Sequence, residues 1–292
     1  MTDGAAAARP GGRFRHGSLA WRGEGSGGAR LLLAALAVLG LVAALVPPLS
    51  SEARRVEALE ALQFALLGIG VPALVALSAP WRLLGLAGRR TGATDAEGNA
   101  VLERPRMADR AAATRRRHPR LARGLAPVAL ATSVFVAWRV PAIVDALARH
   151  GWLSLVEAVT LVGAGTGLWL ELVESPPFAP RLTRPQRIAV AAIVMWTIWV
   201  TAYIVGMSHT SMYRAYAHVA GRDLSVSADQ AFSTGILWLA SLCAFLPLIF
   251  SNLMKWLRSD EDADAALYRL VRDGDAGSST DSARQAEPHG RG

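Results

Sequence analysis

Long runs of apolar residues, rather than helical or strand-like alternation, dominate this sequence. Six runs stand out, at residues 31–49, 56–77, 125–144, 152–172, 188–207 and 232–250. About 20 apolar residues in an α-helix, rising ~1.5 Å each, span the ~30 Å hydrocarbon core of a bilayer. The pattern therefore predicts an all-α, polytopic membrane protein with about six transmembrane helices in one bundle.

The segments between and outside these runs divide the chain further. Residues 1–29 are rich in Gly, Ala and Arg, and residues 259–292 are charged and then rich in Ser and Gly. Both compositions predict disordered tails, the N-terminal one basic. Residues 82–123 hold eleven arginines and few large apolar residues, which predicts a basic cytoplasmic loop within a membrane bundle over residues 30–258.

The first apolar run has two interpretations, a transmembrane anchor or a cleaved signal peptide. A long basic leader precedes the run, and the sequence Pro-Pro-Leu-Ser-Ser at residues 47–51 is a poor cleavage site. Both features favour an uncleaved anchor.

The distribution of charge orients the predicted helices. Only 18% of the residues are charged, and the net charge of +8 comes from arginines that mostly flank the apolar runs. With both termini in the cytoplasm, six of the 31 Lys and Arg residues face outward and twenty-five face inward. This asymmetry follows the positive-inside rule. We therefore expect both termini to be cytoplasmic, with membrane lipid around the helices and no nucleic acid partner.

Ionisable residues within or beside the apolar runs are the first candidate site. Glu57 and Glu60 lie at the outer start of the second span. Arg139 lies near the outer end of the third span, with Asp145 after it, and Glu157 follows the start of the fourth. A charge in lipid costs at least ~2.5–3.5 kcal/mol at a helix centre. We predict that these five residues form a polar cluster beneath the outer surface; alternatively, each side chain reaches the lipid headgroups alone.

A second candidate site follows the fifth run, where Met207, His209 and Met212 lie close together in sequence. Thioether and imidazole groups suit monovalent copper, so these residues are a candidate metal site, and copper is the one cofactor that the residues suggest. Packing of two interfacial methionines beside a histidine is the alternative interpretation. The sequence contains no Walker or His-Glu-x-x-His motif, and we do not expect an enzyme.

Two further patterns concern packing and surface charge. Gly163 and Gly167 form a Gly-x-x-x-Gly motif in the fourth run, which predicts close helix packing at that point. Glu171 and Glu174 lie near the inner end of the same run, facing nearby arginines, which predicts surface ion pairs that contribute little stability.

Four short motifs lie in order along residues 56–258. They comprise Pro72 with Ser-Ala-Pro at 78–80, Trp138-Arg139-Val140-Pro141 followed by Asp145, Ser-Leu-Val-Glu-Ala at 154–158 followed by Trp169, and Tyr213 and Tyr216 followed by Asp229, Gln230 and Trp238. In this order they resemble the motifs of the CtaG-type cytochrome c oxidase assembly factors, multi-span membrane proteins linked to copper insertion. The resemblance implies a bacterial inner-membrane location and oxidase subunits or other respiratory membrane proteins as partners.

This sequence departs from the family pattern at its histidines. The resemblance places family histidines near five positions, occupied here by Glu60, Phe64, Arg139, Ser154 and Ala158. A guanidinium has no lone pair with which to bind a metal ion. We therefore expect an accessory factor of the CtaG type that no longer binds copper itself, with an ion-paired cluster in place of the metal pocket. An accessory or scaffold subunit of a respiratory complex, or a small-solute transporter, are the alternatives.

Overall fold

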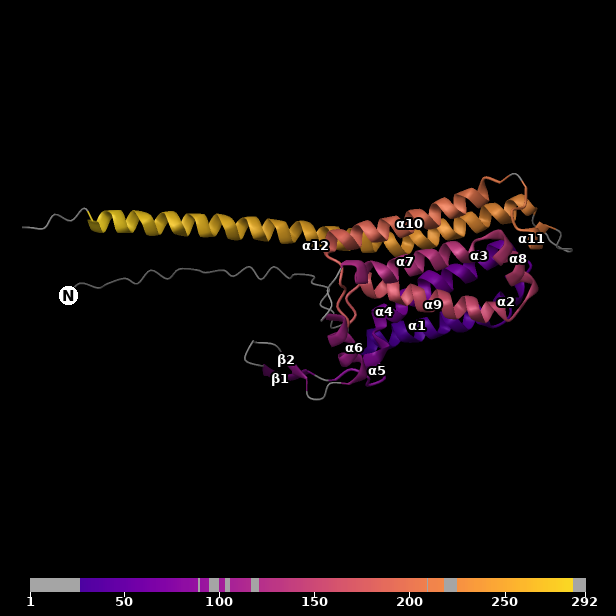
Figure 1. Ribbon diagram of the computed structural model, residues 1–292, viewed down its shortest axis with the longest axis horizontal. Coiled ribbons are helices and arrows are strands. Elements are labelled where there is room, and N and C mark those ends of the chain that lie inside the picture. Colours follow the sequence, from indigo (N-terminus) through magenta and orange to yellow (C-terminus); the bar gives the residue numbers. More distant parts are fainter. Residues whose placement is uncertain are drawn as a thin grey trace, which may run out of the picture.

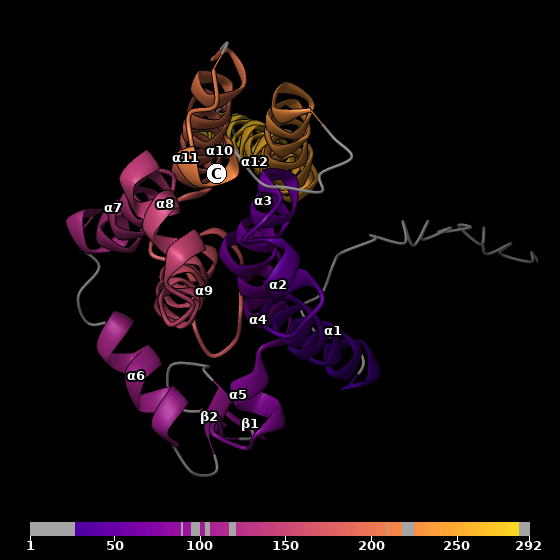
Figure 2. The ribbon, with the colours of Figure 1, turned by 90° about the vertical axis from the view of Figure 1, so that its right-hand side faces the viewer.

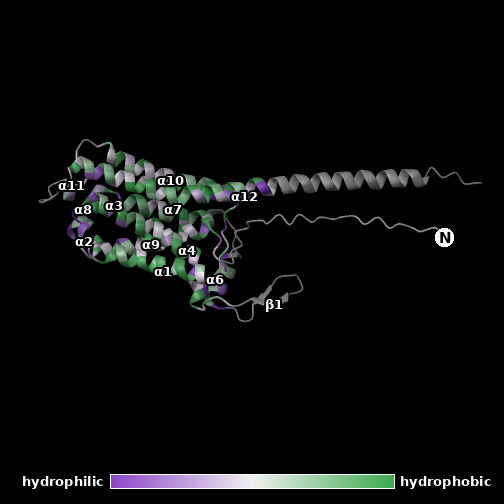
Figure 3. Cartoon of the chain, turned by 180° about the vertical axis from the view of Figure 1, so that it is seen from behind, coloured by the Kyte–Doolittle hydropathy of each residue, from purple (hydrophilic) through white to green (hydrophobic). Residues whose placement is uncertain are grey.

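The apolar runs form helices in the computed structural model, which describes residues 27–88, 90–94, 100–102, 106–116, 121–208, 210–217 and 225–285. Among these residues, five segments are long and apolar enough to cross a membrane, namely Gly27–Leu45, Glu57–Ser78, Leu153–Leu172, Arg184–Gly206 and Val226–Ser259. A bent pair of helices supplies a sixth crossing if it is counted as one span. The predicted all-α, polytopic membrane class is therefore confirmed, and Figure 3 shows how apolar residues dominate these helices.

Helices account for nearly all the regular structure of the described residues (Figure 1). The elements of the first half are α1 (Gly27–Leu45), α2 (Leu49–Glu52), α3 (Glu57–Ala65), the π-helical turn η1 (Leu66–Gly70), α4 (Val71–Ser78), α5 (Pro80–Leu83), β1 (Arg90–Thr94), β2 (Ala100–Leu102) and α6 (Met107–Arg116). Those of the second half are α7 (Leu121–Trp138), α8 (Pro141–Arg149), α9 (Leu153–Leu172), α10 (Arg184–Gly206), α11 (Arg214–Ala217) and α12 (Val226–Gln285).

The second crossing, which consists of α3, η1 and α4, is the centre of the bundle. In its most apolar stretch 61% of the residues are buried, against 11% in α1. It packs against α1, α9 and α12, while α10 pairs with α12 at the opposite edge of the bundle from α1 (Figure 2). Polar groups on α3 are therefore enclosed by protein, whereas most of the α1 surface is left to lipid.

A proline explains the wide turn η1 in the middle of this crossing. Pro72 has no N–H, so the carbonyl of Gly68 loses its usual helical donor four residues later. Helix α9 packs on this irregular turn through Gly165: a Cβ there would lie 2.6 Å from the Gly68 oxygen and 2.7 Å from the Pro72 ring. Around Gly163, by contrast, there is open space. The closest glycine contact on α9 is thus made by Gly165, not by the predicted pair of Gly163 and Gly167.

The third crossing breaks directly after Trp138. Helices α7 and α8 meet there at an angle of 67°. Pro141 disfavours helical geometry at the residue before it, and Val140 is accordingly extended, with φ −67° and ψ 128°. Arg139 lies at this break, where its side chain is buried in the bundle.

Regular structure also occurs in two regions for which the sequence predicts none. The basic loop at 82–123 contains the antiparallel hairpin β1–β2 and helix α6. Helix α12 continues to Gln285, although a tail without regular structure is predicted from residue 259. Residues 265–272 are rich in Ala, Leu and Arg, which are strong helix formers. Of the predicted tails at 1–29 and 259–292, residues 1–26 and 286–292 lie outside the described residues.

Substituting the two glycines of α9 separately tests the packing on η1. Gly165→Ala is expected to lower the stability of the bundle by about 1–3 kcal/mol, because the new methyl group overlaps the Gly68 carbonyl and the Pro72 ring. Gly163→Ala is the matched control and is expected to leave stability unchanged or slightly raised, since its methyl group enters open space. Thermal unfolding in detergent measures both, and equal melting temperatures for the two variants would contradict the packing.

Candidate functional site

A buried ion pair lies at the break between α7 and α8. The Nη1 group of Arg139 donates to Oε2 of Glu60 on α3, and the two residues are only 5% and 2% exposed. In the low dielectric of a protein interior such a charge-assisted hydrogen bond is stronger than the same contact in water. The pair joins the central crossing to the third one.

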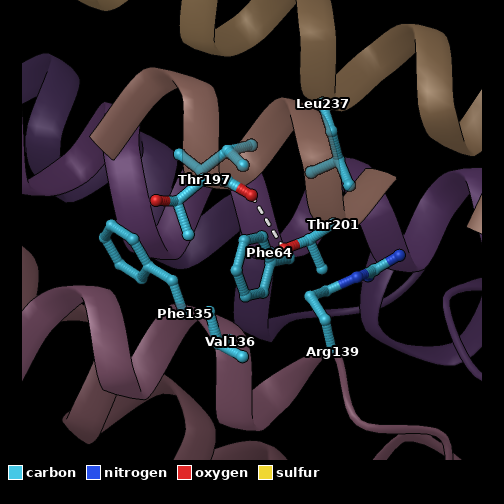
Figure 4. Close-up of a pocket in the computed structure, with 8 residues that line it drawn as sticks. Phe64, Phe135, Val136, Arg139, Thr197, Thr201 and Leu237 are labelled. Atoms are coloured by element: carbon cyan, nitrogen blue, oxygen red, sulfur yellow. Dashed lines mark hydrogen bonds between the residues drawn. The ribbon is translucent and has the colours of Figure 1, made fainter. Parts of the chain in front are cut away.

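Aromatic rings lie over the Arg139 guanidinium. Its Cζ atom is 5.5 Å from the ring centroid of Phe64 on α3 and 5.5 Å from that of Tyr213 in the loop that joins α10 to α12. Figure 4 shows Arg139 beside Phe64, where α7, α10 and α12 meet α3. Cation–π contacts of this kind contribute about 0.5–2 kcal/mol each when shielded from water. The guanidinium is thus held by one carboxylate and two aromatic rings.

Two further carboxyl groups lie around the ion pair. Glu57 is 1% exposed and shares a hydrogen bond with the Ser233 side chain, whose hydroxyl is 3.5 Å from Nη2 of Arg139. Glu157 on α9 is also buried and interacts electrostatically with both Glu60 and Arg139. We call Glu57, Glu60, Arg139, Glu157 and Ser233 the Arg139 cluster. Of the three carboxyl groups, only that of Glu60 contacts the guanidinium directly. Each of the three carboxyl groups keeps an oxygen without a hydrogen-bond donor among the described residues.

Asp145, which the sequence groups with these residues, holds the outer loop instead. Its Oδ1 atom accepts a hydrogen bond from the backbone N–H of Ala215 on α11, at 3.0 Å. Two tyrosine hydroxyls beside it donate to backbone carbonyls, Tyr213 to Arg139 at 3.2 Å and Tyr216 to Ala53 at 2.9 Å. Burial raises the pKa of Tyr213 to about 12, so this phenol remains a neutral donor at physiological pH. Helix α11 is therefore fastened over the Arg139 cluster.

The remaining motif residues connect helices to one another. Asp229 on α12 accepts hydrogen bonds from the backbone N–H groups of Glu57 and Ala58, both at 2.9 Å, and so caps the N-terminus of α3. Gln230 donates to the carbonyls of Val205 and Ser208 at the end of α10. These contacts fix α12 against α3 and α10 beside the cluster.

Both motif tryptophans bridge neighbouring helices as well. Trp138 donates its indole N–H to the Thr160 hydroxyl on α9 at 2.9 Å, and Trp238 donates to the Trp199 carbonyl on α10 at 3.3 Å. Pro141 acts differently, because it produces the helix break at Arg139 described above.

Of the three candidate copper ligands, only Met207 and Met212 lie in the described part of the chain, where their surroundings differ. Met207 is 57% exposed at the end of α10, while Met212 packs against Val144, Val205 and the two loop tyrosines. His209 lies outside the described residues. Among the described residues, no group of three His, Cys, Asp or Glu side chains is arranged to hold a metal ion.

The chemistry of the Arg139 cluster does not fit copper either. Monovalent copper prefers thiolate, thioether or imidazole ligands, whereas the cluster offers carboxylate oxygens. Its central group is a guanidinium, which has no lone pair and repels a cation. The residues present therefore suit an ion pair rather than a bound metal ion.

A second buried carboxylate lies at the C-terminal end of α9, where the sequence predicts a surface group. Glu171 is fully buried, and its Oε1 atom is 2.6 Å from Nη2 of Arg115 on α6. Its Oε2 atom accepts a hydrogen bond from the backbone N–H of Arg181 at 2.9 Å. Glu174, by contrast, remains largely exposed and is 3.7 Å from Arg187. Glu171 thus anchors α6, which belongs to the basic loop, to the membrane bundle.

Comparison with known proteins identifies the family of the chain. The family model described as cytochrome c oxidase caa3 assembly factor (Caa3_CtaG) matches residues 15–259, which is most of the sequence. The chain therefore belongs to this family. Searches of curated proteins and of solved structures found no match.

Two substitutions with very different expected effects test the electrostatics of the cluster. Arg139→Leu is expected to lower stability by about 3–5 kcal/mol, because it leaves Glu60 buried without its cation. Glu157→Gln is expected to preserve stability or raise it, since it removes a surplus carboxylate that lacks a direct ionic partner. Thermal unfolding in detergent is expected to show a large fall in melting temperature for Arg139→Leu and a negligible change for Glu157→Gln. Equal losses in both variants would argue against the assigned roles.

The anchoring of α6 is tested at the two glutamates of the inner end. Glu171→Gln is expected to weaken the contacts of Arg115 and Arg181 and to speed tryptic cleavage of the basic loop several-fold. Glu174→Gln is the control and is expected to leave the cleavage rate unchanged, since an exposed pair contributes at most about 1 kcal/mol. Time courses of limited proteolysis measure the difference, and identical rates would contradict the anchoring.

Proposed function

Starting from membership of the caa3 assembly-factor family, we propose that this protein supports the maturation of a cytochrome c oxidase in the bacterial inner membrane. It acts through contacts with oxidase subunits rather than by carrying copper at the Arg139 cluster. The proposal assigns the protein no catalytic step of its own. The arginine distribution supports an orientation with both termini in the cytoplasm, which puts the Arg139 cluster near the outer surface.

The observation that carries this proposal is the contact between Arg139 and Glu60. By the family resemblance, both positions are places where an imidazole is expected. Here they hold an acid and a base that neutralise each other in a buried pair. Such a pair still holds helices together, because separating the two charges in the bundle is costly. The pair offers a metal ion no imidazole or thioether. The contacts between the helices are therefore retained, whereas the ability to bind copper is not.

Contacts around the pair support a structural role for it. Asp229 caps α3, Ser233 lies between Glu57 and Arg139, and Tyr213 covers the guanidinium from the outer loop. Of these groups, Ser233 and Tyr213 contact the Arg139 guanidinium directly. A sealed and rigid outer end suits a protein that presents fixed surfaces to partners in the membrane.

Oxidase levels in the source organism test the proposal. Deletion of this chain is expected to lower the haem a absorbance and oxidase activity of membranes, and the wild-type chain is expected to restore both. The double variant Glu60→Leu, Arg139→Leu is expected to restore them as well, because an apolar pair of similar size often replaces a buried ion pair without loss. Unchanged oxidase after deletion, or failure of a stably expressed double variant, would contradict the proposal.

Copper content of the purified protein provides the matching biochemical control. Wild type and the His209→Ala variant are both expected to contain far less than one copper per chain after loading with monovalent copper and desalting. Stoichiometric copper in the wild type that is lost from His209→Ala would restore the metal-binding interpretation.

A further inference from the structure

Helices α10 and α12 lie side by side at one edge of the bundle (Figure 2), and four aromatic side chains on this pair contact one another. Trp199 contacts Trp196 and Trp238 with centroid distances of 5.6 Å each, and Tyr203 stacks on Trp238 at 6.4 Å. Trp196 is 58% exposed, Tyr203 51% and Trp238 39%. We call these four residues the aromatic face.

The indole N–H groups of this face differ in their hydrogen bonds. Trp199 donates to the Ser241 hydroxyl at 2.8 Å, and Trp238 donates to the Trp199 carbonyl at 3.3 Å. The N–H of Trp196 has no acceptor among the described residues, and its one contact of note is the edge-on packing with Trp199. Trp196 therefore presents an unpaired donor on the outside of the bundle.

The depth of Trp196 makes this donor costly in lipid. It lies twelve residues after Arg184 and ten before Gly206, the ends of α10. At ~1.5 Å per residue it is about 18 and 15 Å from those ends, which puts it near the centre of the hydrocarbon core. Interfacial tryptophans, which bond to headgroups and water, lie at the ends of spans instead. Acyl chains offer no acceptor, and an unpaired polar group in an apolar medium is destabilising.

Helix α1 shows what a lipid-facing surface of this protein looks like. Its exposed large residues are all leucines and valines, and no hydrogen-bonding side chain occurs between Leu31 and Leu45. The aromatic face departs from that composition at the same depth. This contrast indicates that something other than acyl chains covers Trp196.

We infer that the aromatic face is the docking surface for a transmembrane helix of an oxidase subunit, which supplies an oxygen acceptor to the Trp196 indole at mid-membrane. The inference rests on the proposed function and names the surface through which it operates. Tryptophan and tyrosine provide large, rigid contact areas that are typical of binding hot spots. The acceptor on the partner is a Ser, Thr, Asn or Gln side chain or a carbonyl at a helix irregularity.

A second copy of this chain is a poorer match for this donor than a different protein. In a symmetric dimer within a membrane, the same surface meets itself and the residues in contact lie at equal depth. The exposed α10 residues one turn away from Trp196 are Ile193 and Val200, whose side chains have no oxygen. The nearest hydroxyl at this depth belongs to Thr197, which is half-buried and already bonded to the Ile193 carbonyl at 2.9 Å. In a symmetric dimer the Trp196 N–H would therefore lie mainly against aliphatic side chains, which favours a different protein as the partner.

Photo-crosslinking in cell membranes tests the inference directly. A benzophenone amino acid replaces Trp196 in the full-length chain, and a matched control replaces Val38 of α1, which is 61% exposed. Mass spectrometry of the products is expected to show an oxidase subunit crosslinked at position 196 and only lipid at position 38. Lipid alone at both positions, or a crosslink to a second copy, would overturn the inference.

Removing only the donor provides an independent measurement. Trp196→Phe keeps an aromatic ring but loses the N–H, and it is expected to lower the amount of oxidase subunit that co-purifies at least threefold. Ile193→Leu is the control and is expected to leave co-purification unchanged, and immunoblots check that both variants are present at wild-type levels. Suppose that deletion of the chain lowers oxidase levels, but Trp196→Phe leaves co-purification unchanged and no oxidase subunit is crosslinked at position 196. The docking surface is then wrong and the proposed function stands. If deletion has no effect, both fall.

Discussion

The ion pair between Arg139 and Glu60 is the interaction on which this end of the bundle depends. A guanidinium cannot lose its proton at any physiological pH, so its charge has to be compensated where it lies. Because Pro141 breaks the third crossing, the charge lies inside the bundle rather than on a smooth helix surface. Glu60, the Phe64 ring and the Tyr213 ring then converge on it from α3 and from the outer loop. One unavoidable charge thus determines how three parts of the chain meet.

The contacts around the pair follow from the same constraint. Asp229 satisfies backbone donors at the start of α3, which keeps Glu60 at the depth of Arg139. The tyrosines of the outer loop bond to carbonyls at the ends of other helices and close the site from outside. At the inner end Glu171 holds α6 in a similar way, through Arg115. Carboxylates therefore hold short helices at both ends of the bundle, Asp145 at α11 and Glu171 at α6, whereas apolar packing forms the middle.

Features that depend on local sequence could be predicted, whereas those that depend on distant partners could not. The length of the apolar runs was enough to predict a membrane protein. The predicted topology was enough to place Glu60 and Arg139 at the same depth. Ser233 gave no signal, because one serine in an apolar run is ordinary. The sequence predicts a surface position for Glu171, because its partner Arg115 lies in a loop whose position no periodicity reveals. Asp145 was grouped with the cluster by proximity in sequence, but the helix break directs it to α11.

The most direct test of the central claim is the coupling free energy between Glu60 and Arg139. A double-mutant cycle with Glu60→Leu, Arg139→Leu and the combined variant isolates this quantity from unfolding measurements in detergent. A direct buried pair predicts that the combined variant is more stable than either single variant, with a coupling of about 2 kcal/mol or more. Additive losses, with a coupling near zero, would mean that the two side chains do not hold the bundle together.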